Sequence, residues 1–399
     1  MNNSIQLDNV GCLYTANKDG VQSYENTNIF IDNGLISSKE ENKEYLTIDC
    51  KGKMVTSGFV DPHTHPVFYN KRDSEYEMRL AGSSYEEISK NGGGIISSVK
   101  GVRKASEDEL VNKLDRRLDR FIENGTTTIE AKSGYGLNIE SELKSLSVID
   151  KLNRTHAIDM VPTFMGAHAF PNEFKNDHQG YVELICKEMI PAVSEQGIAK
   201  FNDVFCEKNY FSINESRQIL ESGIQYGLKP RMHADEFVDS GAAELAGKIG
   251  ALSADHLMAV SEQGIKALAE NNVIATLLPG TTFFLGKENY APARKLIDSG
   301  IKIALATDYN PGSSHIQSMP FIISLACLFL GLTVEEAFAA ATYNAAESLG
   351  LHNDVGSVEL GKKADLIIWD LDSLIDIPYY ISNHPIQKVL KNGEVVFGA

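Results

Sequence analysis

Two histidines separated by one residue, His63 and His65, end the stretch G-F-V-D-P-H-T-H at residues 58–65. Side chains at alternate positions of an extended strand point to the same side, so both imidazoles can converge on one point. Two imidazoles at the end of a strand supply half of a metal site. Histidine pairs of this spacing also occur by chance in cores and on surfaces. The interpretation therefore depends on whether other ligands lie at matching places in the chain.

The elements that would position these histidines can be read from the middle of the chain, where short β-branched runs alternate with stretches of helical spacing. The runs predict strands at 55–60, 126–131, 158–165, 201–206, 229–234, 252–256, 273–278 and 302–307. The stretches predict helices at 106–124, 138–153, 178–196, 212–227, 239–249, 261–271, 288–299, 315–330 and 333–349. Eight strand–helix units are typical of the α/β class and of a parallel (β/α)8 barrel of the TIM type.

Both ends of the chain are rich in extended segments instead. Asn33-Gly34 is typical of a hairpin turn. Strands are predicted at 28–32, 35–37, 47–50, 54–55, 356–358, 364–370, 389–390 and 395–397. We expect one small β-sandwich domain built from both termini. Its parts would be residues 1–55 and 353–399, on either side of a barrel at 56–352.

Chemistry in such a barrel lies at the carboxyl ends of the strands. His233 ends the fifth run and Asp308 follows the eighth, so we predict that they complete a metal site with His63 and His65. Three neutral imidazoles and one carboxylate suit one Zn²⁺ or Fe³⁺ ion per subunit. Such an ion lowers the pKa of a bound water towards about 7 and polarises a carbonyl oxygen, which is the chemistry of hydrolysis.

Three side chains near the predicted ligands can move protons during such a reaction. Glu236 follows His233 by one short turn, where it can act as general base on the water, unless it is an exposed loop carboxylate. His256, at the end of the sixth run, can orient or share that proton. Asp308 can shuttle protons while it stays bound to the metal.

Composition limits the classes of partner. A hydrophobic content of 43% is typical of a soluble globular protein, and a net charge of −17 disfavours nucleic acid and acidic membranes as partners. We expect neither a signal peptide nor a membrane span, because the start of the chain lacks a basic segment before an apolar core and no apolar run approaches about 20 residues. The five cysteines, odd in number and without C-x-x-C spacing, predict reduced thiols in a cytoplasmic protein.

Motifs along nearly the whole chain resemble the amidohydrolase superfamily. They are G-F-V-D-P-H-T-H (58–65), M-H-A-D-E (232–236), A-D-H (254–256), A-T-D-Y-N-P-G-S (306–313) and G-K-K-A-D-L-I-I-W-D (361–370). Narrower motifs are similar to those of the members that open an imidazolone ring bearing a propionate, in histidine degradation. These are E-A-K-S-G-Y-G (130–136), F-M-G-A-H (164–168) and D-Y-N-P-G-S-S (308–314). The resemblance implies the same four metal ligands and a small-molecule substrate.

The resemblance also implies a set of substrate contacts. They are Arg72, Tyr135, His168, Glu236, Asn310, Gly312 and Ser313. Arg72 can bind a propionate through a bidentate fork, although a solvated loop arginine is the alternative. Tyr135 and His168 can hydrogen-bond a small polar heterocycle.

Related binuclear enzymes carry a carboxylated lysine at the end of strand four, where this sequence reads V-F-C-E at 204–207. Lys132 follows the second strand instead, and we interpret it as structural or as a neighbour of the substrate. We therefore expect a single metal ion. Barrels of this superfamily are often dimers, so the resemblance leaves a homodimer open.

Two other functions remain open at this point. A mononuclear deaminase acting on a nucleobase-like heterocycle would share Glu236 and His256, but it would need no arginine for a carboxylate. A barrel that serves only as a binding or scaffold protein would typically have lost metal ligands, and this sequence retains them.

Overall fold

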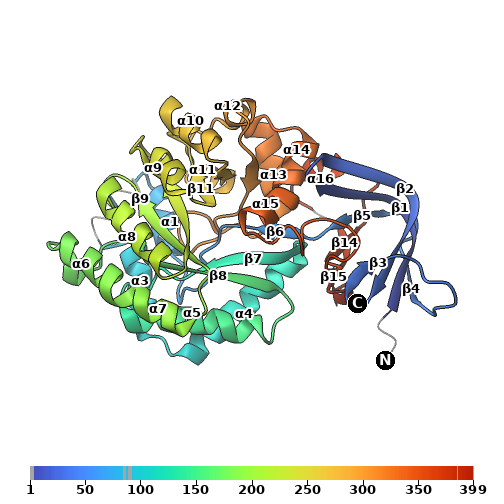
Figure 1. The fold of residues 1–399 in the computed structure, drawn as a ribbon, viewed down its shortest axis with the longest axis horizontal. Helices are drawn as coiled ribbons and strands as arrows, with labels where there is room; N and C mark the ends of the chain where they lie inside the picture. The colour runs from blue at the N-terminus through green and yellow to red at the C-terminus, as the bar shows by residue number, and fades with distance from the viewer. Residues whose placement is uncertain (1–3, 84–86, 89–91, 384, 399) are drawn as a thin grey trace.

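The computed structural model of the protein describes residues 4–83, 87–88, 92–383 and 385–398, which form a barrel and a smaller β-sheet beside it (Figure 1). The two ends of the chain lie at the small sheet, and the middle of the chain forms the barrel. The predicted fold, a (β/α)8 barrel with a small β domain built from both termini, is confirmed. The predicted domain limits stay a prediction.

Eight parallel strands form the barrel, and each lies next to the strand that precedes it in the sequence. Their side chains are buried almost throughout, because helices cover the outer face and side chains fill the interior. The strands are β6 (Phe59–Asp61), β7 (Thr126–Lys132), β8 (Asp159–Ala167), β9 (Phe201–Cys206), β10 (Lys229–Ala234), β11 (Ser253–His256), β12 (Ile274–Leu277) and β13 (Ile303–Leu305). Every predicted run except the first corresponds to one of these strands.

The first predicted run, 55–60, is wrong as a single barrel strand. The structure divides it at Gly58 into β5 (Met54–Ser57), which belongs to the small sheet, and β6, which begins the barrel. A Cβ atom at Gly58 would lie 2.5 Å from Oγ1 of Thr127, so only glycine fits where the chain passes from one sheet to the other.

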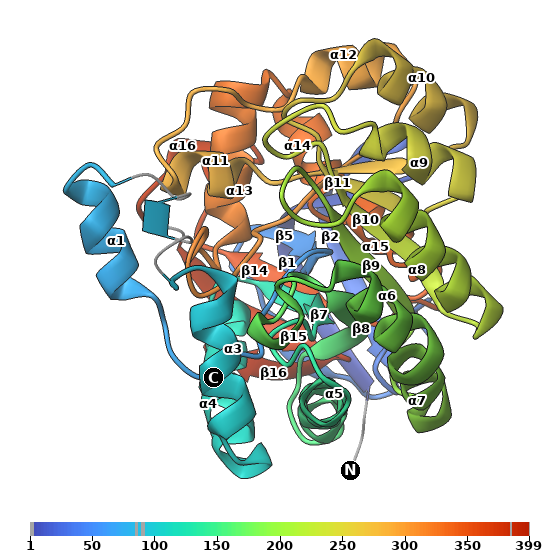
Figure 2. The ribbon, with the colours of Figure 1, turned by 90° about the vertical axis from the view of Figure 1, so that its left-hand side faces the viewer.

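Helices surround the barrel strands (Figure 2). Three of them, α4, α8 and α14, begin at capping boxes, in which a serine or threonine and a glutamate three residues later satisfy each other's amides. The helices that follow the strands are α4 (Glu107–Glu123), α5 (Ile139–Asn153), α6 (His178–Leu184), α7 (Ile190–Gln196), α8 (Ile213–Gln225), α9 (Ala242–Ile249), α10 (Glu262–Glu270), α12 (Ala293–Asp298), α13 (Met319–Leu325), α14 (Val334–Ala340) and α15 (Tyr343–Ser348).

Several predicted helices differ in extent from those observed. Only α12 forms within the predicted helix 288–299, because Pro292 disfavours helical backbone in the residues before it. The predicted helix 333–349 is divided at Thr342, whose backbone leaves the helical region (φ −131°, ψ −92°). The helices predicted at 178–196 and 315–330 contain π-helical segments, at Ile185–Met189 and Ala326–Leu330.

Some elements were not predicted at all. The helices α1 (Asp73–Leu80), α3 (Ile95–Lys104), α11 (Pro279–Phe284) and α16 (Asp376–Tyr379) fall in this group. The strand predicted at 356–358 is wrong, because these residues form no ladder. The amide of Val358 donates instead to the Thr15 hydroxyl, at 2.7 Å.

The small sheet is mixed and contains eight strands in the order β16-β15-β14-β5-β1-β2-β3, with β4 paired to β1. It curls around an apolar core of its own, which includes Leu7, Ile31, Val55 and Leu366. The strands that were not yet given are β1 (Ser4–Asn17), β2 (Gly20–Asp32), β3 (Leu35–Ser37), β4 (Leu46–Asp49), β14 (Leu366–Trp369), β15 (Ile386–Lys391) and β16 (Glu394–Phe397).

The barrel closes between its first and last strands just beyond their carboxyl ends. The amide of Asp308 donates to the His63 carbonyl at 3.1 Å, and the amide of His65 donates to the Tyr309 carbonyl at 2.8 Å. Next to this seam, the amide of Thr307 donates to the Asp61 carboxylate at 3.0 Å. The seam therefore brings the H-x-H segment beside Asp308.

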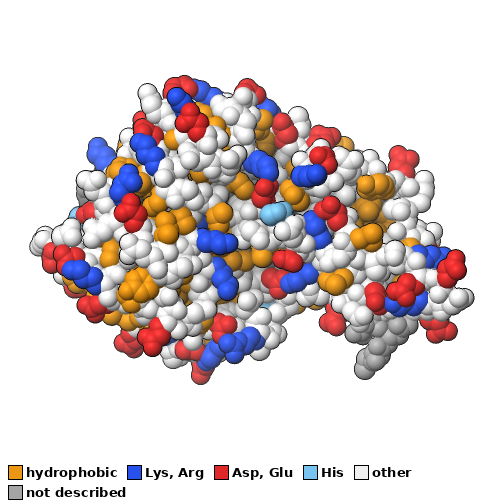
Figure 3. Space-filling view, viewed as in Figure 1, with side chains coloured by type: hydrophobic (Ala, Val, Ile, Leu, Met, Phe, Trp, Pro, Cys, Tyr) orange, Lys and Arg blue, Asp and Glu red, His pale blue; other side chains and the backbone are white. Residues whose placement is uncertain are grey.

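Acidic and basic side chains are interspersed on the face of the molecule shown in Figure 3. In the part of the chain that the structure describes, no helix combines the length and apolar character needed to cross a bilayer. All five cysteines are free. The exclusion of nucleic acid stays a prediction from net charge.

Candidate active site

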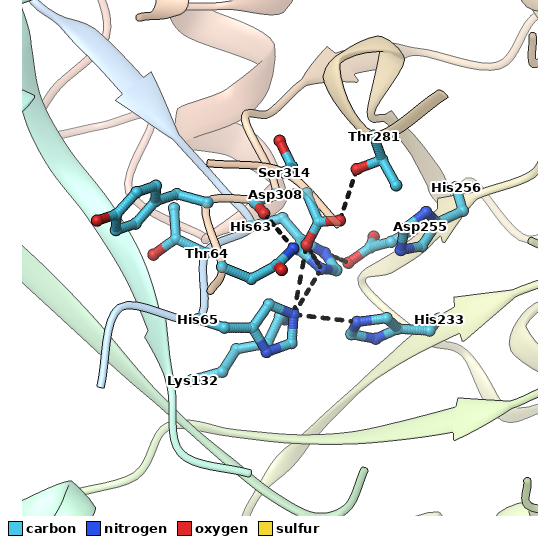
Figure 4. Close-up of polar contacts among 12 residues, drawn as sticks. His63, Thr64, His65, Lys132, His233, Asp255, His256, Thr281, Asp308 and Ser314 are labelled. Atoms are coloured by element: carbon cyan, nitrogen blue, oxygen red, sulfur yellow. Dashed lines mark hydrogen bonds and ion pairs between the residues drawn. The ribbon is translucent and has the colours of Figure 1, made fainter. Parts of the chain in front are cut away.

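Three histidine side chains converge at the carboxyl end of the barrel (Figure 4). His63 and His65 follow β6, and His233 lies in β10. Nε2 of His65 is 3.3 Å from Nε2 of His63 and 3.3 Å from Nε2 of His233. All three side chains are buried, and burial lowers the pKa of His63 and His65 well below the usual value, so both rings are neutral.

The donor set fits one small cation. Two nitrogens bound at about 2.0–2.1 Å to a tetrahedral Zn²⁺ lie roughly 3.3 Å apart, which is the spacing of these Nε2 atoms. Oδ1 of Asp308 lies 3.6 Å from Nε2 of His63 and 3.5 Å from Nε2 of His65. The structure therefore places His63, His65 and Asp308 where one ion could bind all three, with His233 next to His65. His63 and His233 also form a second cluster of potential ligands with His256.

Carboxylates behind two of the imidazoles fix which nitrogen faces the site. Nδ1 of His63 lies 2.6 Å from Oδ2 of Asp255, and Nδ1 of His233 lies 3.1 Å from Oδ2 of Asp203. A neutral imidazole that donates from Nδ1 presents an unprotonated Nε2, which is the form that binds a metal. The Nε2 lone pairs of His63 and His233 are therefore directed into the site by the protein itself.

Asp308 reaches the site from a strained backbone position. Its φ is +51°, in the left-handed region, and its Oδ2 accepts a hydrogen bond from Oγ1 of Thr281 at 2.6 Å. Burial raises the pKa of Asp308 to about 6. A cation at Oδ1 would favour the charged carboxylate and reverse that shift.

Glu236 and His256 lie next to this cluster. Nδ1 of His256 is 3.8 Å from Oε1 of Glu236, and both side chains are buried. Burial, and then the charges of Asp308 and Glu207, raise the pKa of Glu236 well above its usual value. Glu236 is only 7% exposed, so the alternative of an exposed loop carboxylate is excluded.

The loop that carries Glu236 is anchored on both sides. Oε2 of Glu207, at the end of β9, accepts from the amide of Phe237 at 2.7 Å. The Asp235 carboxylate accepts from the amides of Ala242 and Ala243, both at 3.1 Å, at the start of α9. These bonds hold Glu236 in a fixed place between its neighbours.

A cavity opens above the converging histidines and is lined by polar, charged and aromatic side chains. Its walls include every predicted substrate contact except Gly312. The lining residues are His65, Arg72, Ile95, Tyr135, His168, Phe205, His233, Glu236, Phe237, His256, Asp308, Asn310 and Ser313.

Arg72 is a buried wall residue, 5% exposed, so the alternative of a solvated loop arginine is excluded. Its amide donates to the Pro311 carbonyl at 2.9 Å, and its Nη1 lies 3.8 Å from Oε2 of Glu75. A Cβ atom at Gly312 would lie 2.0 Å from Nη2 of Arg72. Gly312 therefore contributes by leaving room for the guanidinium.

His168 and Tyr135 also line the cavity, with ring centroids 5.1 Å apart. Nδ1 of His168 donates to the Gly134 carbonyl at 2.9 Å, which leaves its Nε2 as an acceptor. The His168 ring stacks on His65, with centroids 4.9 Å apart. Burial lowers the pKa of His168 to about 3, so the ring is neutral.

Asn310 organises the loop after β13. Its Nδ2 donates to the Asp308 carbonyl at 2.7 Å and to Oγ of Ser313 at 2.8 Å. Its Oδ1 accepts from the amides of Gly312 and Ser313, both at 2.8 Å. We infer that Asn310 shapes the cavity mainly through this loop, since its amide group is already occupied.

Several residues that shape the site were not predicted. They are Asp203, Asp255, Arg231, Glu207 and Thr281, all of them buried. The sequence did contain a signal for three of them, because a charged residue within an apolar strand run needs a buried partner. These three are Asp203, Arg231 and Asp255. Thr281 gave no such signal, because a threonine beside Pro279-Gly280 is typical of a turn.

Comparisons with known proteins identify the family. The amidohydrolase family matches residues 54–396. An imidazolonepropionase from Geobacillus sp. (strain WCH70) is 48% identical over 383 residues, which cover 93% of this chain and 90% of the relative. An imidazolonepropionase from Shouchella clausii (strain KSM-K16) is 51% identical over 350 residues, which cover 88% of this chain and 78% of the relative. The chain belongs to the imidazolonepropionase family of amidohydrolases.

Solved structures with the same fold are less similar to this chain in sequence than these imidazolonepropionases are. An adenosine deaminase from Xanthomonas campestris with bound zinc has a TM-score of 0.76 at 16% identity, covering 98% of this chain and 92% of that one. A 5-methylcytosine deaminase from Klebsiella pneumoniae has a TM-score of 0.75 at 14% identity, covering 98% of both chains. At these identities the likeness concerns the fold alone.

Proposed function

We propose that the protein hydrolyses the ring C–N bond of 4-imidazolone-5-propanoate, a cyclic amide, to N-formimidoyl-L-glutamate in histidine degradation. The observation that carries this proposal is a buried arginine, Arg72, in the same cavity wall as a three-histidine, one-aspartate donor set. The donor set suits hydrolysis, and the arginine suits a substrate with a propionate. Membership of the imidazolonepropionase family supports both parts.

We propose that one Zn²⁺ or Fe³⁺ ion is held by His63, His65, His233 and Asp308. When bound, the ion supplies Lewis acidity towards a carbonyl oxygen and a water molecule. The buried carboxylate of Glu236 takes a proton from the attacking water and returns it to the ring nitrogen that leaves. The ring carbonyl carbon thereby becomes a carboxylate, and the amide C–N bond breaks.

His256 and the walls of the cavity complete the proposed roles. His256, 3.8 Å from Glu236, orients that carboxyl and shares its proton. The unprotonated Nε2 of His168 accepts a hydrogen bond from a ring N–H, and the Tyr135 hydroxyl binds a second polar atom of the ring. Arg72 and the Ser313 loop bind the propionate.

The alternative of a nucleobase deaminase shares the fold and the proton-transfer residues. A nucleobase carries no carboxylate, so a deaminase would make no use of the Arg72 guanidinium in the cavity wall, which pairs with Glu75 at 3.8 Å. For this reason the deaminase is the less favoured of the two candidate functions.

The decisive experiment follows the loss of imidazolone absorbance with purified protein, and measures Zn and Fe content on the same sample. We expect turnover that scales with metal content, and the metal analysis identifies the ion. Metal-loaded protein that leaves the imidazolone unchanged but deaminates a nucleobase would contradict the proposal.

Replacing Arg72 with methionine is expected to raise KM by roughly 10²-fold, because a bidentate, charge-assisted contact with the propionate is lost. We expect a much smaller effect on kcat, since Arg72 acts on the remote carboxylate rather than on the ring. Steady-state kinetics of both enzymes give the two parameters.

The matched control for Arg72→Met changes the substrate instead of the protein. An imidazolone without its propionate should be hydrolysed at a similar kcat/KM by the wild type and the variant. A variant whose KM for the full substrate stays at the wild-type value would show that Arg72 does not bind the carboxylate.

A further inference from the structure

Beneath the metal ligands lies a buried lysine that the proposed reaction does not use. Nζ of Lys132, at the end of β7, is 2.6 Å from Oδ2 of Asp203 and 2.7 Å from Oε1 of Glu130. None of the three side chains has any exposed surface. Lys132 is not part of the cavity wall, so it is placed to act on the protein and not on the substrate.

A second buried cation, Arg231, approaches the same oxygen of Glu130 as Lys132 does. Nε of Arg231 is 3.4 Å from Oε1 of Glu130, and its Nη2 is 3.5 Å from Oδ2 of Asp255. Two backbone carbonyls fix this guanidinium, those of Pro62 and Ser348, each at 2.9 Å. Arg231, too, is fully buried.

These groups form one row across the barrel interior, which we call the ionic row. Its members are Asp203, Lys132, Glu130, Arg231 and Asp255. Each end of the row touches a metal ligand, because Asp203 bonds His233 and Asp255 bonds His63. The three carboxylates and two cations leave a single negative charge in a region that water does not reach.

Asp203 contacts both the row and the ligand. Its Oδ2 accepts from the ammonium of Lys132 at 2.6 Å and lies 3.1 Å from Nδ1 of His233. Its Oδ1 accepts from the backbone amide of His233 at 3.2 Å and lies 3.2 Å from the same Nδ1. Without the ammonium, this buried carboxylate would lack its closest opposite charge and would rotate towards other donors. That rotation would alter how Asp203 holds the His233 ring.

We propose that the ionic row is a positioning device for the metal centre, in which Lys132 and Arg231, joined through Glu130, hold the Asp203–His233 and Asp255–His63 pairs and thereby set metal affinity. This inference rests on the proposed metal site. A role in folding alone is the competing explanation, since buried ion pairs often contribute little net stability. The two explanations differ in what happens to metal binding.

Lys391 provides a matched control for Lys132. It is also a buried lysine, 3% exposed, whose Nζ lies between two carboxylates, at 2.7 Å from Oδ2 of Asp159 and 2.5 Å from Oδ2 of Asp365. It belongs to β15 in the small sheet, and among the described residues its ion pairs are with Asp159 and Asp365, neither of which is a proposed metal ligand. Lys391→Met should therefore weaken folding without a specific effect on the metal.

The test titrates metal-free protein with Co²⁺ and follows the visible absorption of the bound ion, which reports both affinity and coordination geometry. We expect Lys132→Met to bind Co²⁺ about 10- to 100-fold more weakly than the wild type, with an altered spectrum, which is the range for partners behind a metal ligand. Lys391→Met should keep the wild-type affinity and spectrum.

A double variant separates positioning from folding. Glu130→Gln with Lys132→Met removes one charge of each sign and keeps the net charge of the row unchanged, so its thermal unfolding without metal should move back towards the wild type. Its Co²⁺ affinity should stay weakened, because Asp203 still lacks its ammonium.

Each other outcome counts against the inference. Wild-type Co²⁺ affinity in Lys132→Met, or full recovery in the double variant, would assign the ionic row to folding alone. Failure of both variants to fold, while Lys391→Met folds, would lead to the same conclusion. A wild type that binds no Co²⁺ would instead overturn the proposed metal centre, and the inference with it.

Discussion

The substitution Glu236→Gln is expected to lower kcat by about 10³-fold, within the range for loss of a general acid–base group, while the metal stays bound. The buried Glu236 carboxylate lies 3.8 Å from His256 and is the proposed carrier of the proton between water and the leaving nitrogen. An amide of the same shape cannot take up that proton. Turnover and metal content measured on one preparation test both statements.

The control for Glu236→Gln is the same substitution at Glu188, which is exposed on the outside of the barrel. Glu188→Gln should keep wild-type kcat and metal content. A Glu236→Gln enzyme with kcat within a few-fold of the wild type would move the proton-transfer role to another group. Loss of metal in that variant would mean that Glu236 acts in binding the ion instead.

Removal of the Asp308 carboxylate is expected to abolish both metal binding and activity. Loss of an outer partner of a metal ligand typically costs about 10- to 100-fold in affinity, so loss of the only anionic ligand should cost more than that. Asp308→Ala should therefore be purified without stoichiometric metal and show no turnover above background. Metal analysis, and activity before and after adding Zn²⁺ or Fe³⁺, measure the effect.

Asp298→Ala is the matched control, because Asp298 is an exposed aspartate at the end of α12. It should keep wild-type metal content and activity. Thermal unfolding of both metal-free variants shows whether Asp308→Ala remains folded. An Asp308→Ala protein that binds metal and turns over normally would overturn the proposed ligand set.

The four predicted metal ligands could be placed at one end of the barrel from sequence because each lies near the carboxyl end of a recognisable strand, and parallel barrel strands end on the same face. The pairing of His63 with Asp255 could not be predicted. It depends on which side chain of a buried strand points inward and on the register between strands distant in the sequence. The same limit applied to Lys132, whose partner Asp203 lies 71 residues away.

The errors in the fold have local causes. The run at 55–60 reads as one strand, but a continuous apolar stretch does not reveal that Gly58 passes the chain between two sheets. The helix α11 begins at Pro279-Gly280, a pair that favours a turn, so sequence preference opposed the observed structure. Tertiary packing decided both cases.

The seam between the first and last barrel strands would also couple metal binding to the folding of the chain. The pairing ladder runs unbroken from β6 to β13, but within the described residues these two end strands share no ladder and meet only through the bonds around His63, Tyr309 and Asp61. An ion held by ligands from both sides would act as a cross-link, so ion binding and barrel closure become one linked equilibrium. A metal-depleted cell would then leave newly made chains with two open strand edges, where association with other chains begins.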